Sequence, residues 1–408
     1  MFRCIIIANG EDISICLFLV TFLNLTEYVV TFGCEDIDSF HRGTYRVHLK
    51  GYRDGQKIQK KNIVLKWHPD PKARSCFREA YRREFVFFRY IMPKLLDIQR
   101  SFNTIEGLKI KFPNCVFASA EYDKETVAVQ GLSDDGFRLY DRLHEVNLEH
   151  VCLVMKNLAK LHALSFALAK TNPVDFEAIS GLCCKDVQYS IPGPVPKSMK
   201  SFYDASVNVV LDNGARDKLK AFGPHILTAL YKCTQADSYS TICHADCWNN
   251  NIMFKYWRNR PVDVMFIDFQ LTRIASPVTD ISYFLYMSTS RHFLSKHHDY
   301  ILNIYYATLT AVLRQCNLDV NEVYPLNIFQ EHLREYSVLG LIEALVSMMI
   351  ITAQSEEALK MTEMKYEECD GIFCENEQQD RSLFIGRVND VVSDFFERNY
   401  SLDGILNK

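Results

Sequence analysis

Residues 241–270 read TICHADCWNNNIMFKYWRNRPVDVMFIDFQ, and this stretch decides the fold prediction. Its first part fits the pattern H-x-D-x-x-x-x-N through His244, Asp246 and Asn251. A polar turn (KYWRNRP) follows, and then an apolar run that ends at Asp268. A polar turn between two apolar runs predicts a hairpin. The hairpin would place the strand that ends at Asp268 beside the loop that carries Asp246 and Asn251.

These residue types suit the transfer of a phosphoryl group from a nucleotide. Hard divalent cations neutralise the phosphates and take carboxylate and amide oxygens as ligands, which Asn251 and Asp268 could supply. Asp246 could then orient an acceptor hydroxyl and take its proton, while His244 would orient the loop. A plain structural interpretation makes Asp246 a helix cap and Asn251 a turn residue. We prefer the chemical one because an apolar run ending in Asp-Phe follows at hairpin distance.

Two upstream residues complete this predicted site. Lys66 lies in the apolar run IVLKW, which reads as a strand, and Glu84 lies in the following helical segment RREFVFFRYIMP. A strand lysine can reach the phosphates of a nucleotide while an ion pair to a helical glutamate holds it. The structural alternatives are a snorkelling lysine and a solvated glutamate.

The order of the predicted elements indicates the fold class. Residues 44–66 read as two strands joined by a polar hairpin, and residues 75–96 read as a helix with apolar positions three and four apart. The segments after residue 136 are mostly helical. We therefore predict an α+β, protein-kinase-like fold with two lobes. Its parts would be an atypical N-terminal extension (1–36), a small β-rich lobe (37–132) and a large helical lobe (133–408).

Composition limits the partners and the compartment. The chain has 408 residues, 48% hydrophobic and 24% charged, with a formal net charge of −4. No long basic run occurs, so we expect no nucleic-acid partner. The 14 cysteines form no CxxC pair, and we expect a cytoplasmic protein with reduced thiols. The apolar residues 13–23 are too few to span a bilayer, which takes about 20, so we expect no stable membrane insertion. Secretion is the minor alternative, because acidic residues stand where a signal peptide has positive ones.

Several of these motifs together resemble the ecdysteroid kinase-like family of arthropods, within the choline kinase and aminoglycoside phosphotransferase group. CHADCWNNNIMF resembles its catalytic segment, and IDFQLTRIASPVTDISYFLYMSTS resembles its metal-binding segment and the next helix. GFRLYDR, LAKLHALSFAL, EFVFFRYIMPKL and GLIEALVSMMI are similar to other parts of it. The resemblance implies ATP with Mg²⁺ and a small-molecule hydroxyl acceptor, either an ecdysteroid or a foreign compound.

Carried over to this sequence, the resemblance gives each predicted residue a role. It makes Asp246 the catalytic base, Asn251 and Asp268 the metal ligands, and Lys66 with Glu84 the phosphate-binding pair. It also implies adenine contacts, made mostly by backbone, in the interlobe stretch at Gln130 and Leu132.

The sequence departs from the family in its nucleotide loop. The stretch CEDIDSFHRGTYRV keeps only Gly43 where the family has a glycine-containing loop, and Arg42 would substitute for the lost backbone contacts with its charge. This departure keeps a second hypothesis open: a catalytically impaired relative that binds a nucleotide or a lipophilic ligand. A protein kinase is a third, less favoured reading, because no APE-like segment follows Asp268. The sequence does not decide the oligomeric state.

Overall fold

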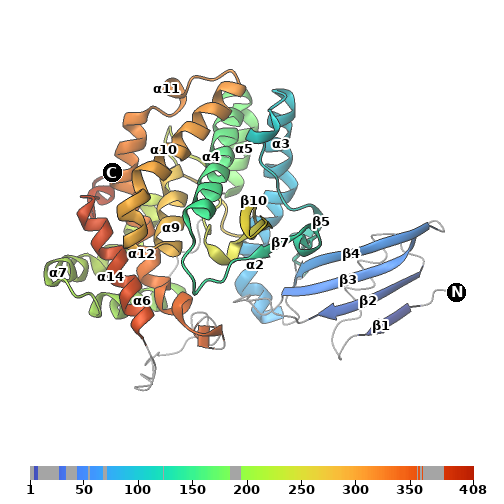
Figure 1. The fold of residues 1–408 in the computed structure, drawn as a ribbon, viewed down its shortest axis with the longest axis horizontal. Coiled ribbons are helices and arrows are strands. Elements are labelled where there is room, and N and C mark those ends of the chain that lie inside the picture. The colour runs from blue at the N-terminus through green and yellow to red at the C-terminus, as the bar shows by residue number, and fades with distance from the viewer. Residues whose placement is uncertain are drawn as a thin grey trace.

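The computed structural model describes residues 4–7, 27–33, 44–53, 56–67, 71–122, 124–183, 194–355, 357–358, 361 and 381–408. A β-sheet lies at one end of the molecule and the helices lie at the other, with the N-terminus beside the sheet (Figure 1). The apolar residues 13–23, Arg42 and Gly43 lie outside the described residues.

The main sheet has six strands in the order β1-β2-β3-β4-β6-β5. β1 pairs with β2 in parallel, and the other pairs are antiparallel. The predicted hairpin is β3 and β4, in register from Thr44 opposite Lys66. Alternate residues of these strands, Val47, Ile63 and Leu65, are buried, as a strand with one face on the core requires. The strands are β1 (Cys4–Ile7), β2 (Glu27–Gly33), β3 (Thr44–Arg53), β4 (Gln56–Lys66), β5 (Cys115–Ser119) and β6 (Thr126–Gln130).

The predicted helix after β4 is present, and it changes its winding halfway. α2 (Pro71–Val86) runs into a π-helical turn, η1 (Phe87–Ile91), and continues as α3 (Met92–Ser101). Pro93 has no N–H to donate to the carbonyl four residues earlier, and its ring would clash there. A π turn takes up this misfit because its bonds span five residues, as between the Met92 N–H and the Phe87 carbonyl.

The helical part is built around α4 and α12. Both are long and apolar enough to span a membrane by composition, yet 78% and 72% of their most apolar windows are buried inside the protein, as expected of core helices. The longer helices here are α4 (Leu148–Thr171), α5 (Pro173–Cys183), α6 (Pro194–Asn208), α7 (Asn213–Phe222), α8 (Ile226–Cys233), α9 (Pro277–Ser288), α10 (Arg291–Gln315), α12 (Leu326–Thr352) and α14 (Ser382–Glu397).

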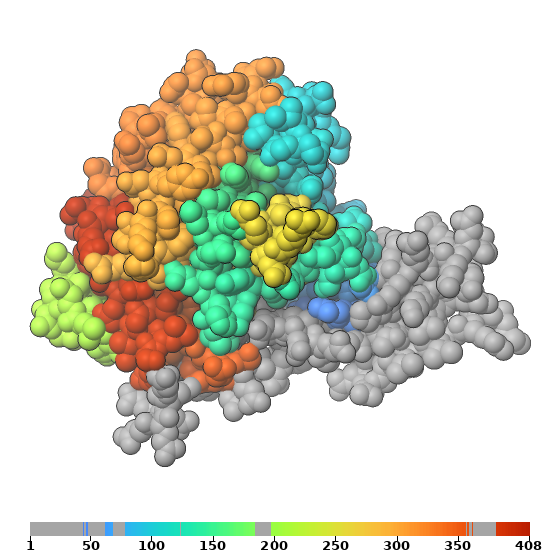
Figure 2. All heavy atoms as spheres, in the orientation of Figure 1, coloured from blue at the N-terminus to red at the C-terminus, as the bar shows by residue number. Residues whose placement is uncertain are grey.

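Two small sheets interrupt the helices and carry the candidate site. β9 (Ile252–Trp257) and β10 (Arg260–Phe266) form the predicted hairpin, and β7 (Phe137–Leu139) pairs with β9. Arg258 and Asn259 at the hairpin tip both have positive φ, the conformation of a tight two-residue turn. Figure 2 shows the hairpin in yellow on the surface, against α4 in green. β8 (Thr241–Cys243), which precedes this hairpin in the sequence, pairs with β11 (Arg273–Ala275), which follows it.

Candidate active site

The hairpin places the strand end at Asp268 beside the loop that carries Asp246 and Asn251, as predicted. Ile252 pairs with Phe266 across the hairpin, and the Ile267 N–H donates to the Asn251 carbonyl over 3.0 Å. Asp268 follows directly on this bond. The residues predicted to hold a cation therefore lie on adjacent pieces of backbone.

Lys66 joins this site from the main sheet. Its ammonium lies 2.8 Å from Oδ1 of Asp268 and 2.8 Å and 2.9 Å from the two carboxylate oxygens of Glu84. The Phe269 N–H also donates to Glu84 over 3.4 Å. The last residue of β4, a residue of α2 and the end of the hairpin are thus tied by one group of charges. The predicted pairing of Lys66 with Glu84 is present in the structure.

The two carboxylates keep Lys66 in its charged form. Burial by itself lowers the pKa of Lys66, but the Asp268 and Glu84 carboxylates outweigh it and raise that pKa well above its ordinary value. Burial raises the pKa of Glu84, and the positive charge of Lys66 opposes this only in part. Lys66 is therefore a fixed positive charge facing Asp268, as binding of a phosphate requires.

Asp246 is held through both of its carboxylate oxygens. Nδ2 of Asn251 donates to Oδ2 over 2.8 Å, and the Tyr283 hydroxyl donates to Oδ1 over 2.8 Å. Burial raises the pKa of Asp246 to about 7, and the negative charges of Asp268 and Glu343 act in the same direction. The two hydrogen bonds oppose this rise. A carboxyl with a pKa near neutrality is suited to taking a proton.

Asn251 can offer its amide oxygen to a cation because its amide nitrogen is already engaged. Nδ2 donates to the backbone carbonyl of Asp246 over 2.9 Å as well as to its side chain. The amide oxygen of Asn251 and the carboxylate of Asp268 are the hard ligands that Mg²⁺ takes. The donor set therefore fits a magnesium ion.

His244 has a supporting position. The Asp246 N–H donates to its Nδ1 over 3.2 Å, so the proton is on Nε2, which donates to the Ile267 carbonyl over 3.0 Å. Burial lowers the pKa of this imidazole and keeps it neutral. His244 was predicted as part of the catalytic set in an orienting role, and these contacts agree with that role. Both of its nitrogens are engaged by backbone, so it is not placed to give a proton to a substrate.

Asp280, in the first turn of α9, supports the loop that carries Asp246 through hydrogen bonds. Its two oxygens accept from the His244 and Ala245 N–H groups, each over 2.7 Å. The carboxylate also accepts from Nε2 of His162 over 3.1 Å. Burial opposes its charge, but these bonds and the nearby imidazoles lower the pKa of Asp280.

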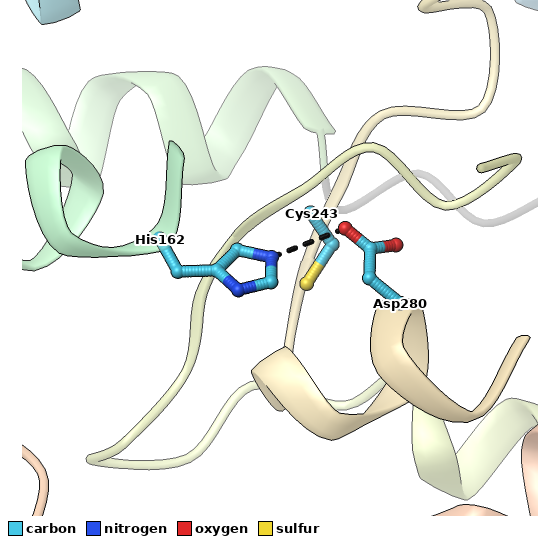
Figure 3. A group of neighbouring side chains, drawn as sticks. All are labelled: His162, Cys243 and Asp280. Atoms are coloured by element: carbon cyan, nitrogen blue, oxygen red, sulfur yellow. Dashed lines mark hydrogen bonds and ion pairs between the residues drawn. The ribbon is translucent and has the colours of Figure 1, made fainter. Parts of the chain in front are cut away.

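Figure 3 shows His162, Cys243 and Asp280 pointing toward one another, with the bond between His162 and Asp280 dashed. Their potential ligand atoms lie within 4.8 Å of one another, and all three residues are buried. Nδ1 of His162 is also engaged, 2.8 Å from the Tyr305 hydroxyl. A metal ion would have to break the bonds with which Asp280 holds the catalytic loop. We therefore interpret this group as a structural support.

Phe269 packs the end of the hairpin against the other parts of the site. Its ring stacks on Phe87 at 3.6 Å between centroids, and the His244 ring lies 4.8 Å away. Phe87 belongs to the π turn that follows the helix of Glu84. Aromatic packing thus links that helix to the catalytic loop.

Two loop residues adopt left-handed backbone. Ala245 has φ 68° and Asp268 has φ 66°. For a residue with a Cβ this conformation costs about 1–2 kcal/mol, and such strain is concentrated at functional sites. Ala245 is small, but its backbone conformation is one that glycine would adopt more easily.

The predicted adenine-contact residues lie at the junction of the two parts. Leu132 is buried in a small apolar cluster with Phe137 and Met265, against which Ile267 packs. Gln130 ends β6, and its side chain donates to Asp135 over 3.1 Å. Leu132 is thus close to the strand that leads to Asp268. Arg42, the predicted substitute for the glycine loop, lies outside the described residues.

Sequence reasoning missed Tyr283 and Glu343 as neighbours of Asp246. Tyr283 follows Asp280 by three residues, so both lie on the same face of α9. That spacing was the available signal for Tyr283. Glu343 is on α12, about 100 residues away in sequence, and the sequence holds no local signal for it.

A surface hollow of about 930 Å³ lies between α7 and α14, lined among others by Lys218, Phe222 and Phe396. None of the residues around Asp246 lines it. It is therefore not part of the candidate site.

The chain is similar to several solved structures of kinases and phosphotransferases. Choline kinase LicA from Streptococcus pneumoniae has 10% identity and a TM-score of 0.44, covering 94% of this chain and 98% of its own. A spectinomycin phosphotransferase in complex with ADP and spectinomycin has 11% identity and a TM-score of 0.41, covering 96% and 100%. An ethanolamine kinase from Plasmodium vivax has 12% identity and a TM-score of 0.38, covering 82% and 80%. No curated protein sequence matches the chain.

The β-sheet at the N-terminal end and the helical remainder, with the site between them, have the two-part arrangement of the predicted protein-kinase-like fold. The model of the ecdysteroid kinase-like family matches residues 37–318. This match covers more than half of the 408 residues, and the chain belongs to that family. The predictions of the fold class and of the family are confirmed.

Proposed function

We propose that the protein transfers the γ-phosphoryl group of ATP to a hydroxyl of a small lipophilic molecule, an ecdysteroid or a foreign compound. The observation that carries this proposal is the bonding of Asp246. Asn251 and Tyr283 donate hydrogen bonds to its carboxylate. Lys66 forms an ion pair with the neighbouring carboxylate of Asp268. A base, an oxygen ligand set and a phosphate-binding charge in one place are the parts that phosphoryl transfer needs.

Each side chain has a defined task in this proposal. Lys66, held by Glu84, would bind the phosphates of ATP and balance their charge. Asn251 and Asp268 would hold Mg²⁺, which neutralises the triphosphate and stabilises the charge that develops on transfer. The junction near Leu132 would receive the adenine.

Asp246 would act on the acceptor. Its carboxylate accepts the hydroxyl proton as the acceptor oxygen forms its bond to the γ-phosphorus and the bond to ADP breaks. The products are the phosphorylated acceptor, ADP and a proton, which Asp246 then releases to solvent.

The alternative, an impaired relative that only binds ligands, gains support from the altered glycine loop. The complete set of contacts around Asp246 and Lys66 argues against it. Folding alone does not require a carboxylate with a pKa near 7 close to a second, partly buried carboxylate, because such charges are costly to take out of water. Placement in the cytoplasm remains part of the proposal.

Turnover of Mg²⁺-ATP with a panel of ecdysteroids and plant glycosides tests the proposal. Comparison of wild type with Asp246→Ala should show a loss of about 10²–10⁴-fold, the usual contribution of general-base catalysis. Asp263→Ala is the control, since this carboxylate lies on the same hairpin and pairs at the surface with Lys111. Equal turnover in wild type and Asp246→Ala would remove Asp246 from the mechanism, and no phosphorylated product from any acceptor would refute the proposed activity.

A further inference from the structure

The second carboxylate oxygen of Asp246 is engaged from outside its own loop. Asn251 secures Oδ2 from within the loop, whereas the donor to Oδ1 is the hydroxyl of Tyr283 in α9. The phenol is buried, with 7% of the residue exposed. A buried Tyr hydroxyl that donates to a carboxylate is held in direction by that bond.

α9 holds the catalytic loop at two points. Asp280, in its first turn, accepts from two loop N–H groups and so fixes the backbone. Tyr283, one turn later on the same face, fixes the side chain of the base. The two contacts together fix where the carboxylate is and how it is rotated.

α9 itself is positioned by α12. A Cβ built on Gly340 would lie 2.5 Å from the backbone carbon of Ser282, the residue before Tyr283. The helices are therefore in backbone contact at this point. The contact leaves α9 little room to shift, so the Tyr283 hydroxyl has a defined position.

We infer that Tyr283 is a positioning residue, which orients the carboxylate of Asp246 so that Oδ1 can take the proton of the acceptor hydroxyl. This inference rests on the proposed function. A carboxylate oxygen has two lone pairs, so Oδ1 can accept from Tyr283 and from the acceptor together. Without the phenol, only the Asn251 amide holds the carboxylate. The carboxylate can then rotate further about its last side-chain bond, and the population with Oδ1 toward the acceptor falls.

Tyr283→Phe is the direct test, and Tyr286→Phe is its matched control. Tyr286 is a buried tyrosine of the same helix, and its hydroxyl also donates to a carboxylate, Asp394, over 3.3 Å. Both variants remove one buried hydroxyl from α9. Only the first removes a contact with the catalytic loop.

The assays are phosphate release from Mg²⁺-ATP without an acceptor, in which water replaces the hydroxyl, and turnover with ecdysone as the acceptor. We expect Tyr283→Phe to lower kcat about 10- to 100-fold, as expected when a reacting group loses its alignment, with the KM for ATP unchanged. Tyr286→Phe should keep the wild-type kcat. Equal kcat in wild type and Tyr283→Phe, or an equal loss in both variants, would overturn the inference.

A double-mutant comparison separates positioning from a general structural effect. If Tyr283 acts through Asp246, adding Tyr283→Phe to the Asp246→Ala variant should lower kcat no further. A further fall in kcat as large as that seen for Tyr283→Phe alone would overturn the inference. If the proposed function itself is wrong, the result is different, because the wild-type protein would then release no phosphate and phosphorylate no acceptor.

Discussion

Gly340→Ala should damage both stability and turnover, although Gly340 is not one of the predicted site residues. The added Cβ would lie 2.5 Å from the carbonyl carbon of Ser282, 2.6 Å from its oxygen and 2.8 Å from its Cβ. Ordinary contact begins at 3.4 Å, so α9 and α12 would have to separate by roughly 0.9 Å (3.4 − 2.5). Backbone on both sides leaves no flexible group to yield. Overpacking of this kind costs about 1–3 kcal/mol of the free energy of unfolding.

The same displacement of α9 would also disturb the candidate active site. This helix carries Asp280 and Tyr283, which hold the catalytic loop. A shift of about 1 Å in a reacting group can cost about 10²-fold in rate, so kcat should fall more than the lost stability alone would explain.

Urea unfolding and kcat, both measured for Gly340→Ala, test this reasoning. Gly386→Ala is the control, since Gly386 lies in α14 and a Cβ there would meet nothing within 4 Å. The free energy of unfolding of the control should rise by about 0.4–1 kcal/mol, because alanine loses less conformational freedom on folding than glycine does. A Gly340→Ala protein with wild-type stability and wild-type kcat would refute the close packing of α9 on α12 as the support of the site.

Three further predictions concern the loop and its ligands. Asp268→Asn should abolish Mg²⁺-dependent turnover, measured by Mg²⁺ titration, whereas Asp263→Asn at the surface of the same hairpin should not; retained magnesium dependence in the first variant would contradict the ligand assignment. Ala245→Gly should raise the free energy of unfolding by about 0.5–1 kcal/mol, because relief of the left-handed strain, about 1–2 kcal/mol, exceeds the entropy cost of glycine; a less stable variant would show that the strain is absent. Turnover should fall as the pH is lowered through about 7, because burial raises the pKa of Asp246 to that value and only its charged form accepts a proton; a flat profile between pH 5.5 and 8.5 would speak against Asp246 as the base.

Much of the site could be predicted because its residues are close in sequence or lie in simple patterns. The hairpin that joins Asn251 to Asp268 follows from a polar turn between two apolar runs, and β3 and β4 follow from the same rule. Residues 75–96 were predicted as one helix, and the π turn just before Pro93 was not predicted. The proline was visible, but whether a helix ends or rewinds there depends on what packs on either side of it.

The local chemistry of this protein was determined by its sequence: the loop with Asp246 and Asn251, the strand end at Asp268, and the order in which Lys66 and Glu84 precede them. Tertiary structure alone decided which groups lie near Asp246, namely Tyr283 from α9 and Glu343 from α12, and how closely those two helices pack at Gly340. The reason is physical. Hydrogen-bonded turns and strand pairs are set by neighbours in the chain, whereas burial and the contacts between helices far apart in sequence depend on how the whole core packs.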